Sequence, residues 1–369
     1  MKITRREALR LGLVSSGVLL SPLGFASSAQ ARTALCAKTM LPASTQVPPI
    51  SPKIDRFQQP LRIMEPLQKV LSKTYQVTRE GITFDQPIDY YEITMQKQTI
   101  ELIPARNGQP AITTSIWSYN GTLPGPLIRQ EKNRESCVRF KNELGKDADG
   151  NDICTSVHLH GMASLPQYDG YAEDITPVGY YKDYYYPNNR ASILWYHDHA
   201  VHKTSRNVYM GLAGMYVVDD EKDRKLNLPK DEYDIPLIIQ DKRFDAAGQL
   251  VFNDRGQRSA FGDVVLVNGT PFPRLKVARR KYRFRILNAS PSRIYQLVLS
   301  QSETRLTGGD FFHVISTDAG LLERPVKMTA PLELLRIGVG ERYGIVIDFK
   351  DYPKHSQLFL HNPAFSNNV

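Results

Sequence analysis

Short runs of β-branched and aromatic residues recur along most of the chain, and turn-forming residues separate them. Such runs are typical of β-strands that bury at least one face. The predicted strands span residues 90–102, 137–142, 192–196, 215–218, 235–239, 264–267, 282–287, 295–299, 332–337 and 343–349. No long stretch shows the periodicity of an amphipathic helix. The pattern predicts an all-β protein of sandwiches or barrels rather than an α/β fold.

One motif occurs twice. Asn120-Gly-Thr is followed by two prolines and then by Arg139-Phe-Lys-Asn, and Asn268-Gly-Thr is followed by two prolines and then by Arg285-Ile-Leu-Asn at nearly the same spacing. A repeat of this length predicts two copies of one β-sandwich unit, at 85–222 and 223–369. Their boundary lies in the charged stretch 219–230, and residues 32–84, which begin rich in Pro, Ser and Thr, are predicted to form an N-terminal arm.

The N-terminus has the features of an export signal. Arg5 and Arg6 precede an apolar run at 11–25, and Ala29-Gln-Ala follows it, which predicts a signal peptide over residues 1–31. The arginine pair resembles the twin-arginine signal, but Ala8 departs from that motif, so the Sec route stays open. Because a stable membrane anchor needs about 20 apolar residues, the alternative of an N-terminal anchor is disfavoured. A periplasmic or secreted protein is expected, with no membrane anchor after processing.

Composition and charge exclude several classes of protein. The chain has 369 residues, 41% of them hydrophobic and 23% charged, so it is neither disordered nor a membrane bundle. The net charge of +9 raises the possibility of a nucleic-acid partner. However, the densest basic stretch alternates, with Lys281, Arg283 and Arg285 on one face of a predicted strand. A solvated strand face is the expected structure, and no nucleic-acid module is found.

Three cysteines are present, at positions 36, 137 and 154. Cys137 and Cys154 flank the polar turn at 145–151 and are predicted to lie on consecutive strands. A disulfide between them and a pair of buried free thiols are equally compatible with this placement. Cys36 lies near the expected mature N-terminus and is assigned no chemistry.

The histidines are the strongest chemical signal. The chain has eight, and four of them form two His-x-His triplets, His158-Leu-His160 and His197-Asp-His199. Each triplet ends a strand-like run, so the two-residue period of a strand points both imidazoles of a pair to one side. Four neutral nitrogen ligands converging on one volume suit copper or zinc. The sequence therefore predicts a metal site.

Other sites of comparable chemistry lack support. Zinc hydrolases add carboxylate or cysteine ligands and a positioned base, and the nearby acids do not have the required spacing. These acids are Asp169, Glu173, Asp174 and Asp198. No nucleophilic serine motif and no dinucleotide-binding motif occurs.

The motifs taken together resemble the multicopper oxidase family, and within it the spore-coat laccases, bilirubin oxidases and phenoxazinone synthases. The matching stretches begin at Asn120 (NGTLPGP), Val157 (VHLHG), Asp169 (DGY), Ile193 (ILWYHDH), Gly211 (GLAGMY), Val267 (VNG), Lys281 (KYRFRILNA) and Glu341 (ERY). The resemblance covers roughly residues 85–365 and implies tandem cupredoxin-like Greek-key β-sandwiches. It also implies one-electron oxidation of a phenolic, aromatic amine or tetrapyrrole substrate, coupled to reduction of O2 to water.

The resemblance assigns roles residue by residue. His158 would bind the type 2 copper, and His160 and His197 would bind one type 3 copper. His199 would bind the other type 3 copper. Asp169 would orient ligands and pass protons to bound oxygen. Trp195 and Tyr196 are interpreted as packing residues, and no ligand role is expected for the remaining histidines, which are His202, His313, His355 and His361. The second sandwich is expected to be a spacer.

Half of the expected copper ligands are not found. The family builds a type 1 copper site from two His, a Cys and usually a Met in a third domain, which also supplies the other four trinuclear ligands. No His-Cys-His occurs in this sequence. The type 1 site and the third domain are therefore expected to be absent, and the chain is expected to be inactive alone. A fragment or frameshifted gene is the favoured explanation; ligands supplied in trans and a non-catalytic copper-binding or scaffold protein are the alternatives.

Overall fold

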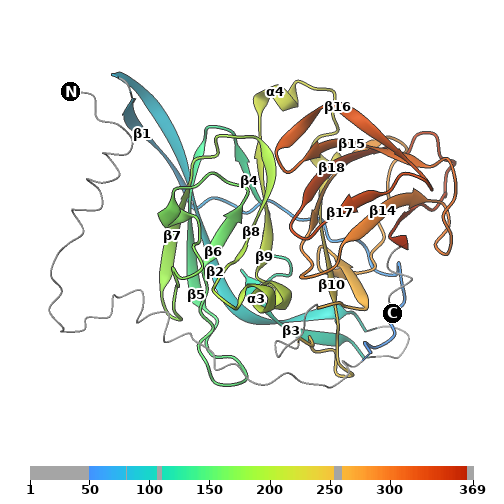
Figure 1. Cartoon of the computed structure of the whole chain (residues 1–369), viewed down its shortest axis with the longest axis horizontal. Coiled ribbons are helices and arrows are strands. Elements are labelled where there is room, and N and C mark those ends of the chain that lie inside the picture. The colour runs from blue at the N-terminus through green and yellow to red at the C-terminus, as the bar shows by residue number, and fades with distance from the viewer. Residues whose placement is uncertain (1–49, 80, 106–109, 253–259, 364–369) are drawn as a thin grey trace, which may run out of the picture.

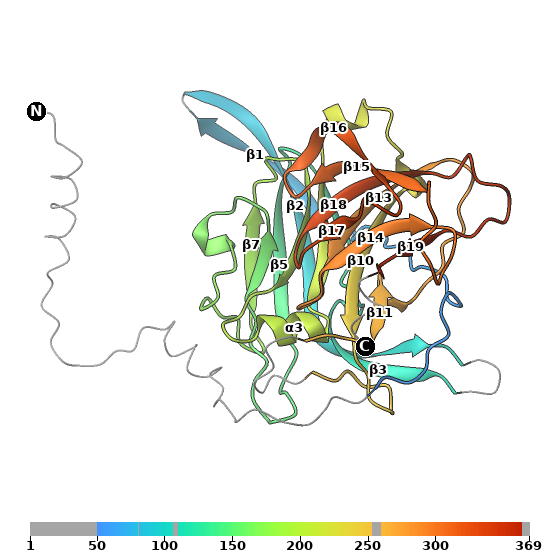
Figure 2. The same ribbon diagram turned by 45° about the vertical axis from the view of Figure 1, so that its right-hand side comes forward.

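The computed structural model describes residues 50–79, 81–105, 110–252 and 260–363. The predicted signal peptide, the first part of the predicted arm and Cys36 lie outside these residues. Two β-sandwiches stand side by side, the first in blue to yellow-green and the second in yellow to red (Figure 1). Turning the molecule keeps this arrangement and shows a hairpin projecting from the first sandwich (Figure 2).

The first sandwich consists of two sheets that enclose one core. One sheet has the order β1-β2-β5-β7, with β3 also paired to β2, and the other has the order β4-β9-β8-β6. The strands are β1 (Leu71–Arg79), β2 (Ile82–Ile103), β3 (Ile112–Tyr119), β4 (Ile128–Glu131), β5 (Glu135–Glu143), β6 (Val157–His160), β7 (Tyr181–Tyr186), β8 (Ser192–Asp198) and β9 (Ala213–Asp219). Residues from both sheets meet in the core, among them Ile93, Phe140, Leu159 and Tyr196.

The second sandwich has a seven-stranded sheet of order β12-β11-β10-β13-β18-β15-β16, and β17-β14-β19 covers it. The strands are β10 (Asp234–Lys242), β11 (Val264–Val267), β12 (Thr270–Pro271), β13 (Lys281–Asn288), β14 (Tyr295–Ser300), β15 (Phe311–Thr317), β16 (Gly320–Thr329), β17 (Leu335–Ile337), β18 (Arg342–Asp348) and β19 (Phe359–His361). The described helices are short: α3 (Thr204–Met210), α4 (Glu221–Arg224) and the 3-10 turns η1 (Pro166–Tyr168) and η2 (Asp231–Tyr233). None of the described helices is long and apolar enough to cross a membrane.

The repeated motif forms the same turn in both sandwiches. Asn120 and Asn268 have φ values of 54° and 51°, in the left-handed region that asparagine tolerates better than most residues. The side-chain oxygen of Asn120 accepts a hydrogen bond from the Thr94 N–H at 2.7 Å, and that of Asn268 accepts one from the Ile238 N–H at 2.8 Å. The two turns also touch, because a Cβ at Gly269 would lie 2.0 Å from the Leu123 carbonyl oxygen.

The faces between the sandwiches are joined by an apolar cluster and by a buried ionic network. The network corrects the prediction of a solvated strand face, because Arg283 and Arg285 are only 7% and 3% exposed. Arg285 binds Asp234 at 2.7 Å and Asp219 at 2.9 Å. Arg129 of the first sandwich binds the same two carboxylates. Polar and apolar side chains alternate along β13 as predicted, but acids from distant segments, rather than water, cover Arg283 and Arg285.

All ten predicted strands overlap observed strands, although only the last three residues of the predicted strand at 332–337 lie in β17, and the all-β prediction is confirmed. β1 lies in the segment predicted as an arm, and the predicted boundary at residue 222 falls within α4. A Cys137–Cys154 disulfide does not form, since Cys137 is a free thiol on β5 and Cys154, which lies outside any strand, is disulfide-bonded elsewhere. Burial raises the pKa of Cys137 to about 11, so its thiolate is not available at neutral pH.

Candidate metal centre

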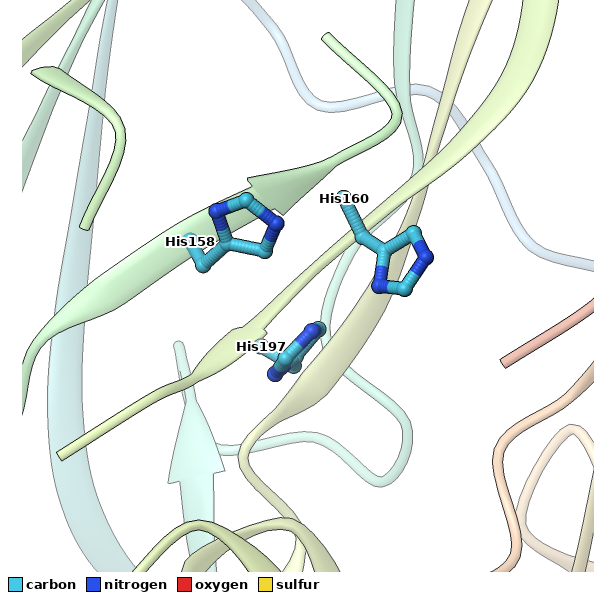
Figure 3. A group of neighbouring side chains, drawn as sticks. All are labelled: His158, His160 and His197. Atoms are coloured by element: carbon cyan, nitrogen blue, oxygen red, sulfur yellow. The ribbon is translucent and has the colours of Figure 1, made fainter. Parts of the chain in front are cut away.

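The ladder between β6 and β8 brings the two His-x-His triplets together. The strands are antiparallel, with His158 opposite His197 and His160 opposite Trp195. Because side chains alternate along a strand, His158, His160, Trp195 and His197 project from the same face of the sheet. Figure 3 shows the three imidazoles turned toward a common space.

Three of the four predicted ligands form a compact group. The candidate ligand atoms of His158, His160 and His197 all lie within 4.8 Å of one another. The His199 ring lies beside this group, with its centroid 5.3 Å from that of His158 and 6.0 Å from that of His197. The structure therefore brings all four predicted ligands into one neighbourhood, with His199 at its margin.

Hydrogen bonds fix the tautomers of two imidazoles. His197 Nδ1 lies 2.8 Å from the Asp198 carbonyl oxygen, and His158 Nδ1 is bonded to the Asp169 carbonyl oxygen. A carbonyl only accepts, so each Nδ1 carries the proton and each Nε2 keeps a free lone pair. His197 Nε2 and His199 Nδ1 are buried and have no hydrogen-bond partner among the described residues. Buried ring nitrogens without a partner are what a metal-ligand set requires before the metal binds.

Burial favours the neutral form of the His160, His197 and His199 imidazoles. It lowers the pKa of His160 to about 4, with the charge of Arg342 as a second cause. Burial also holds the pKa of His197 well below its usual range and lowers that of His199. A metal ion that binds these rings therefore does not have to displace protons at neutral pH.

Two acids lie next to the histidines. Asp169, predicted from the resemblance, has a half-exposed carboxylate with one oxygen 3.5 Å from His158 Nδ1. Asp198 was predicted only as an acid near the site, and the structure shows its side chain fully buried on the opposite side of β8 from the imidazoles. Burial raises the pKa of Asp198 to about 7, although it accepts hydrogen bonds from Ser156, Ala200 and Asn207.

The aromatic neighbours of the histidines are buried, as expected for packing residues. The Trp195 indole stacks on the His197 ring with a centroid distance of 4.0 Å and an interplanar angle of 29°. It also stacks on the His160 ring at 5.5 Å. Tyr196 points to the other side of β8, into the core of the first sandwich, where its hydroxyl donates to the Pro126 carbonyl.

The second sandwich contributes residues that the spacer prediction did not anticipate. A Cβ at Gly340, which has a φ of +78°, would lie 3.5 Å from both the His160 ring and the Trp195 ring. Arg342, only 2% exposed, donates through Nε to the Ile193 carbonyl at 2.9 Å. Gly340 precedes the Glu341-Arg-Tyr motif and Arg342 belongs to it, so this motif was the available sequence signal, but the sequence did not indicate that it reaches the neighbouring sandwich.

The remaining described histidines do not join the group. His313 lies on β15 of the second sandwich against Phe311, and His361 is hydrogen-bonded to the Glu303 carbonyl. His202 and His355 are positive-φ residues outside the strands. The only group of three or more metal-ligating side chains found among the described residues is that of His158, His160 and His197.

Comparison with known proteins identifies the family. Residues 104–223 match the family model described as multicopper oxidase. The chain is 41% identical over 313 residues to a bilirubin oxidase of Albifimbria verrucaria, covering 83% of this chain and 50% of that protein. It is 37% identical over 316 residues to a laccase of Bacillus subtilis, covering 76% of this chain and 58% of that protein. It is also 34% identical over 268 residues to the cell division protein FtsP of Escherichia coli, covering 68% of this chain and 53% of that protein.

A solved structure agrees with these matches. The McoA multicopper oxidase from the hyperthermophile Aquifex aeolicus superposes with a TM-score of 0.66 and 30% identity, covering 84% of this chain and 61% of that one. The chain spans about half the length of the curated relatives it matches. The predicted tandem cupredoxin-like sandwiches and the predicted family are thereby confirmed: the chain belongs to the multicopper oxidase family.

Proposed function

We propose that the rim of the first sandwich binds copper through His158, His160, His197 and His199, as half of the trinuclear site of a laccase-like or bilirubin oxidase-like enzyme. The observation that carries the proposal is the antiparallel pairing of two His-x-His strands, which gathers imidazole nitrogens in a neutral, partly buried setting. Two buried ring nitrogens that have no hydrogen-bond partner in the part of the chain that the structure describes fit ligands that await a metal. Imidazole suits copper.

The proposed ligand roles follow the family resemblance. His158 would hold a type 2 copper, His160 and His197 one type 3 copper, and His199 the other. Copper bound here would pass electrons to dioxygen. The carboxylate of Asp169 is half-exposed and lies beside His158, so it can exchange protons with solvent and hand them to the site.

The reaction as a whole needs more ligands than these four. The family's trinuclear site uses eight histidines, so a second surface carrying four further imidazoles would have to cover the rim. The sequence holds no His-Cys-His for a type 1 site, and its one described free thiol, Cys137, lies away from the histidines on β5. The proposal is therefore that this chain alone binds copper but does not oxidise a phenol, an aromatic amine or a tetrapyrrole with O2.

Copper titration tests the proposal directly. The metal-free chain is titrated with Cu(II), bound copper is counted, and nitrogen coordination is read by electron paramagnetic resonance. His158→Ala with His160→Ala should weaken binding more than about 100-fold, since changes to residues behind the ligands alone cost about 10–100-fold. The matched control removes two imidazoles that lie outside the histidine group, with His355→Ala and His361→Ala, and should bind as the wild type does. Equal binding by both double variants would overturn the proposal, and a blue absorption band would contradict the absence of a type 1 site.

A second candidate is a non-catalytic copper-binding or scaffold protein. The FtsP relative favours it, because that protein bears the name of a cell division protein and not of an oxidase. Failure of the wild-type chain to bind Cu(II) would favour the scaffold function. The DNA beyond codon 369 distinguishes the enzyme fragment, because a fragment predicts a downstream coding stretch with His-Pro-x-His-Leu-His and His-Cys-His.

Export completes the proposal. The arginine pair and apolar run at the N-terminus favour a twin-arginine signal and a periplasmic or secreted destination. Cell fractionation of the wild type and of an Arg5→Lys, Arg6→Lys variant would test it, because export through the twin-arginine route should be lost in the variant. Undiminished export would instead favour the Sec route.

A further inference from the structure

His199 is held differently from the other three imidazoles. The ladder between β6 and β8 runs from the pair His160–Trp195 to the pair Val157–Asp198, where β8 ends. His158, His160 and His197 are therefore fixed by paired strands, whereas His199 lies one residue beyond the ladder. Its backbone is attached to the residue that precedes β6 by one hydrogen bond, from the His199 N–H to the Ser156 carbonyl oxygen at 2.6 Å.

The side chain of Asp198 supplies the attachment that the ladder lacks. One carboxylate oxygen accepts the Ser156 N–H at 3.0 Å, and the other accepts the Ala200 N–H at 3.1 Å. These two N–H groups flank the hydrogen bond that holds the His199 backbone. Ser156 carries the carbonyl that accepts from the His199 N–H, and Ala200 follows His199 in the chain. The second oxygen also accepts Asn207 Nδ2 at 2.9 Å, which connects the turn to α3.

A carboxylate is the group that this pocket requires. Asp198 and Asn207 are both fully buried, and three N–H groups point at the two carboxylate oxygens. A carboxylate offers two acceptor oxygens and, when ionised, satisfies all three donors. An asparagine would turn an NH2 group toward one of these N–H donors, leaving a buried donor without a partner. The middle residue of the other triplet, Leu159, is apolar and lies in the core, where paired strands make such a group unnecessary.

We propose that Asp198 is a positioning residue that holds the His199 imidazole at its place beside His158 and His197. The inference rests on the proposed copper function for its metal readout, but the contacts that carry it are those of the metal-free protein. It extends the ligand assignment, because it makes the fourth imidazole depend on a residue that touches no metal. Groups behind metal ligands commonly orient them and influence affinity.

A double-mutant cycle tests the proposal through Cu(II) affinity. Asp198→Asn is expected to weaken binding by about 10-fold to 100-fold. If Asp198 acts through His199, it should have no further effect on a chain that already carries His199→Ala, so the two changes are non-additive. Full additivity of the two losses would overturn the proposal, as would unchanged Cu(II) affinity in folded Asp198→Asn.

Asp241→Asn is the matched control. Asp241 is also fully buried, and it accepts the Gly262 N–H and Arg293 Nε, each at 2.7 Å, in the second sandwich. Its loss should lower the melting temperature but leave Cu(II) affinity unchanged. An equal loss of Cu(II) affinity in Asp241→Asn would mean that general destabilisation explains the effect, and the proposal would fall. Should Asp198→Asn not fold, Asn207→Ser keeps the carboxylate and removes one donor, and it should show a smaller loss with the same non-additivity.

A readout without metal separates this inference from the proposed function. In the copper-free protein with isotope-labelled histidine, Asp198→Asn should shift or broaden the imidazole resonances of His199 and leave those of His160 in place. Undisturbed His199 resonances would overturn the positioning role. If the wild type bound no Cu(II) at all, the copper function would fail, while the resonances would still decide the role of Asp198.

Discussion

The two sandwiches share their architecture but differ in what their rims carry. Each has a parallel strand pair, β2 with β5 and β10 with β13, and each has a buried asparagine at the end of that pair or one residue before it. Asn142 donates to the Ile153 and Thr176 carbonyls, and Asn288 donates to the Arg293 and Ile337 carbonyls. The strand that follows is β6 with two histidines in the first sandwich and β14 with none in the second. The repeat thus specifies the framework, and a few residues at strand ends specify the chemistry.

The second sandwich nevertheless acts on the histidines of the first. Gly340 lies against His160 and Trp195, and Arg342 bonds to β8. A region without predicted ligands can therefore shape the proposed metal site by closing one of its walls. The predictions below test how far the two sandwiches are equivalent and how far they depend on each other.

The largest effect is expected from the ionic network between the sandwiches. Asp234→Asn should lower the free energy of unfolding by about 3–5 kcal/mol, because it leaves Arg285 buried without its main partner. Burial alone would raise the pKa of Asp234, but hydrogen bonds and charge from Arg285 lower it to about 2. The carboxylate thus stabilises the fold above its unfolded pKa of 3.8. The difference in free energy of unfolding between the wild type and Asp234→Asn should therefore become smaller as pH falls from about 4 toward 2.

Chemical denaturation at several pH values checks this prediction. The control is Asp183→Asn, because Asp183 forms a half-exposed pair with Arg139 and its loss should cost about 1 kcal/mol or less. If Asp234→Asn lost no more free energy of unfolding than the control, the ionic network would not stabilise the contact between the two sandwiches.

The repeated turns should respond unequally to the same substitution. Asn268→Ala should cost about 3 kcal/mol, because this buried side chain makes hydrogen bonds with Ile238, Arg62 and Pro236. Asn120→Ala should cost about 1–2 kcal/mol, because that side chain is exposed and only its bond to Thr94 is lost. Thermal unfolding measures both. Equal losses would mean that the turns are equivalent in energy as well as in shape.

A smaller effect is expected where the second sandwich meets the imidazoles. Gly340→Ala should cost about 1–2 kcal/mol for an alanine at positive φ. Its Cβ would only reach ordinary contact distance from His160, so Cu(II) affinity should change less than about 10-fold, below the range for residues that orient ligands. Gly179→Ala is the control, because Gly179 has a φ of +84° and open space around its Cβ position. If Gly340→Ala lost Cu(II) affinity by more than about 10-fold and Gly179→Ala did not, the added Cβ at residue 340 would disturb His160 despite the 3.5 Å between them.

No effect on copper is expected from the second sandwich's own strand histidine on β15. His313→Ala should leave both the amount of bound Cu(II) and its affinity unchanged, because His313 lies outside the histidine group. Direct copper analysis checks this. A fall in bound copper would mean that the second rim also holds metal.

Sequence patterns predicted the features that depend on neighbouring residues. Short runs of β-branched and aromatic residues identified β5, β8 and β13, and the period of two placed His158 and His160 on one face. β16 was missed because most of its side chains are exposed or half-exposed, which leaves no alternation to detect. Contacts between distant segments were also missed. Arg285 looked solvent-exposed because its acids lie 51 and 66 residues away, and Arg342 reaches a carbonyl 149 residues away.

The two sandwiches share the carboxylates of Asp219 and Asp234, and this sharing affects how the protein unfolds. Each acid binds Arg129 of the first sandwich and Arg285 of the second. Separating the sandwiches would break the pairs that Arg129 forms with Asp234 and that Arg285 forms with Asp219, and it would expose the apolar residues between the sandwiches to water. Heating should accordingly produce one cooperative transition in calorimetry, and neither half should survive as a stable fragment after limited proteolysis near α4.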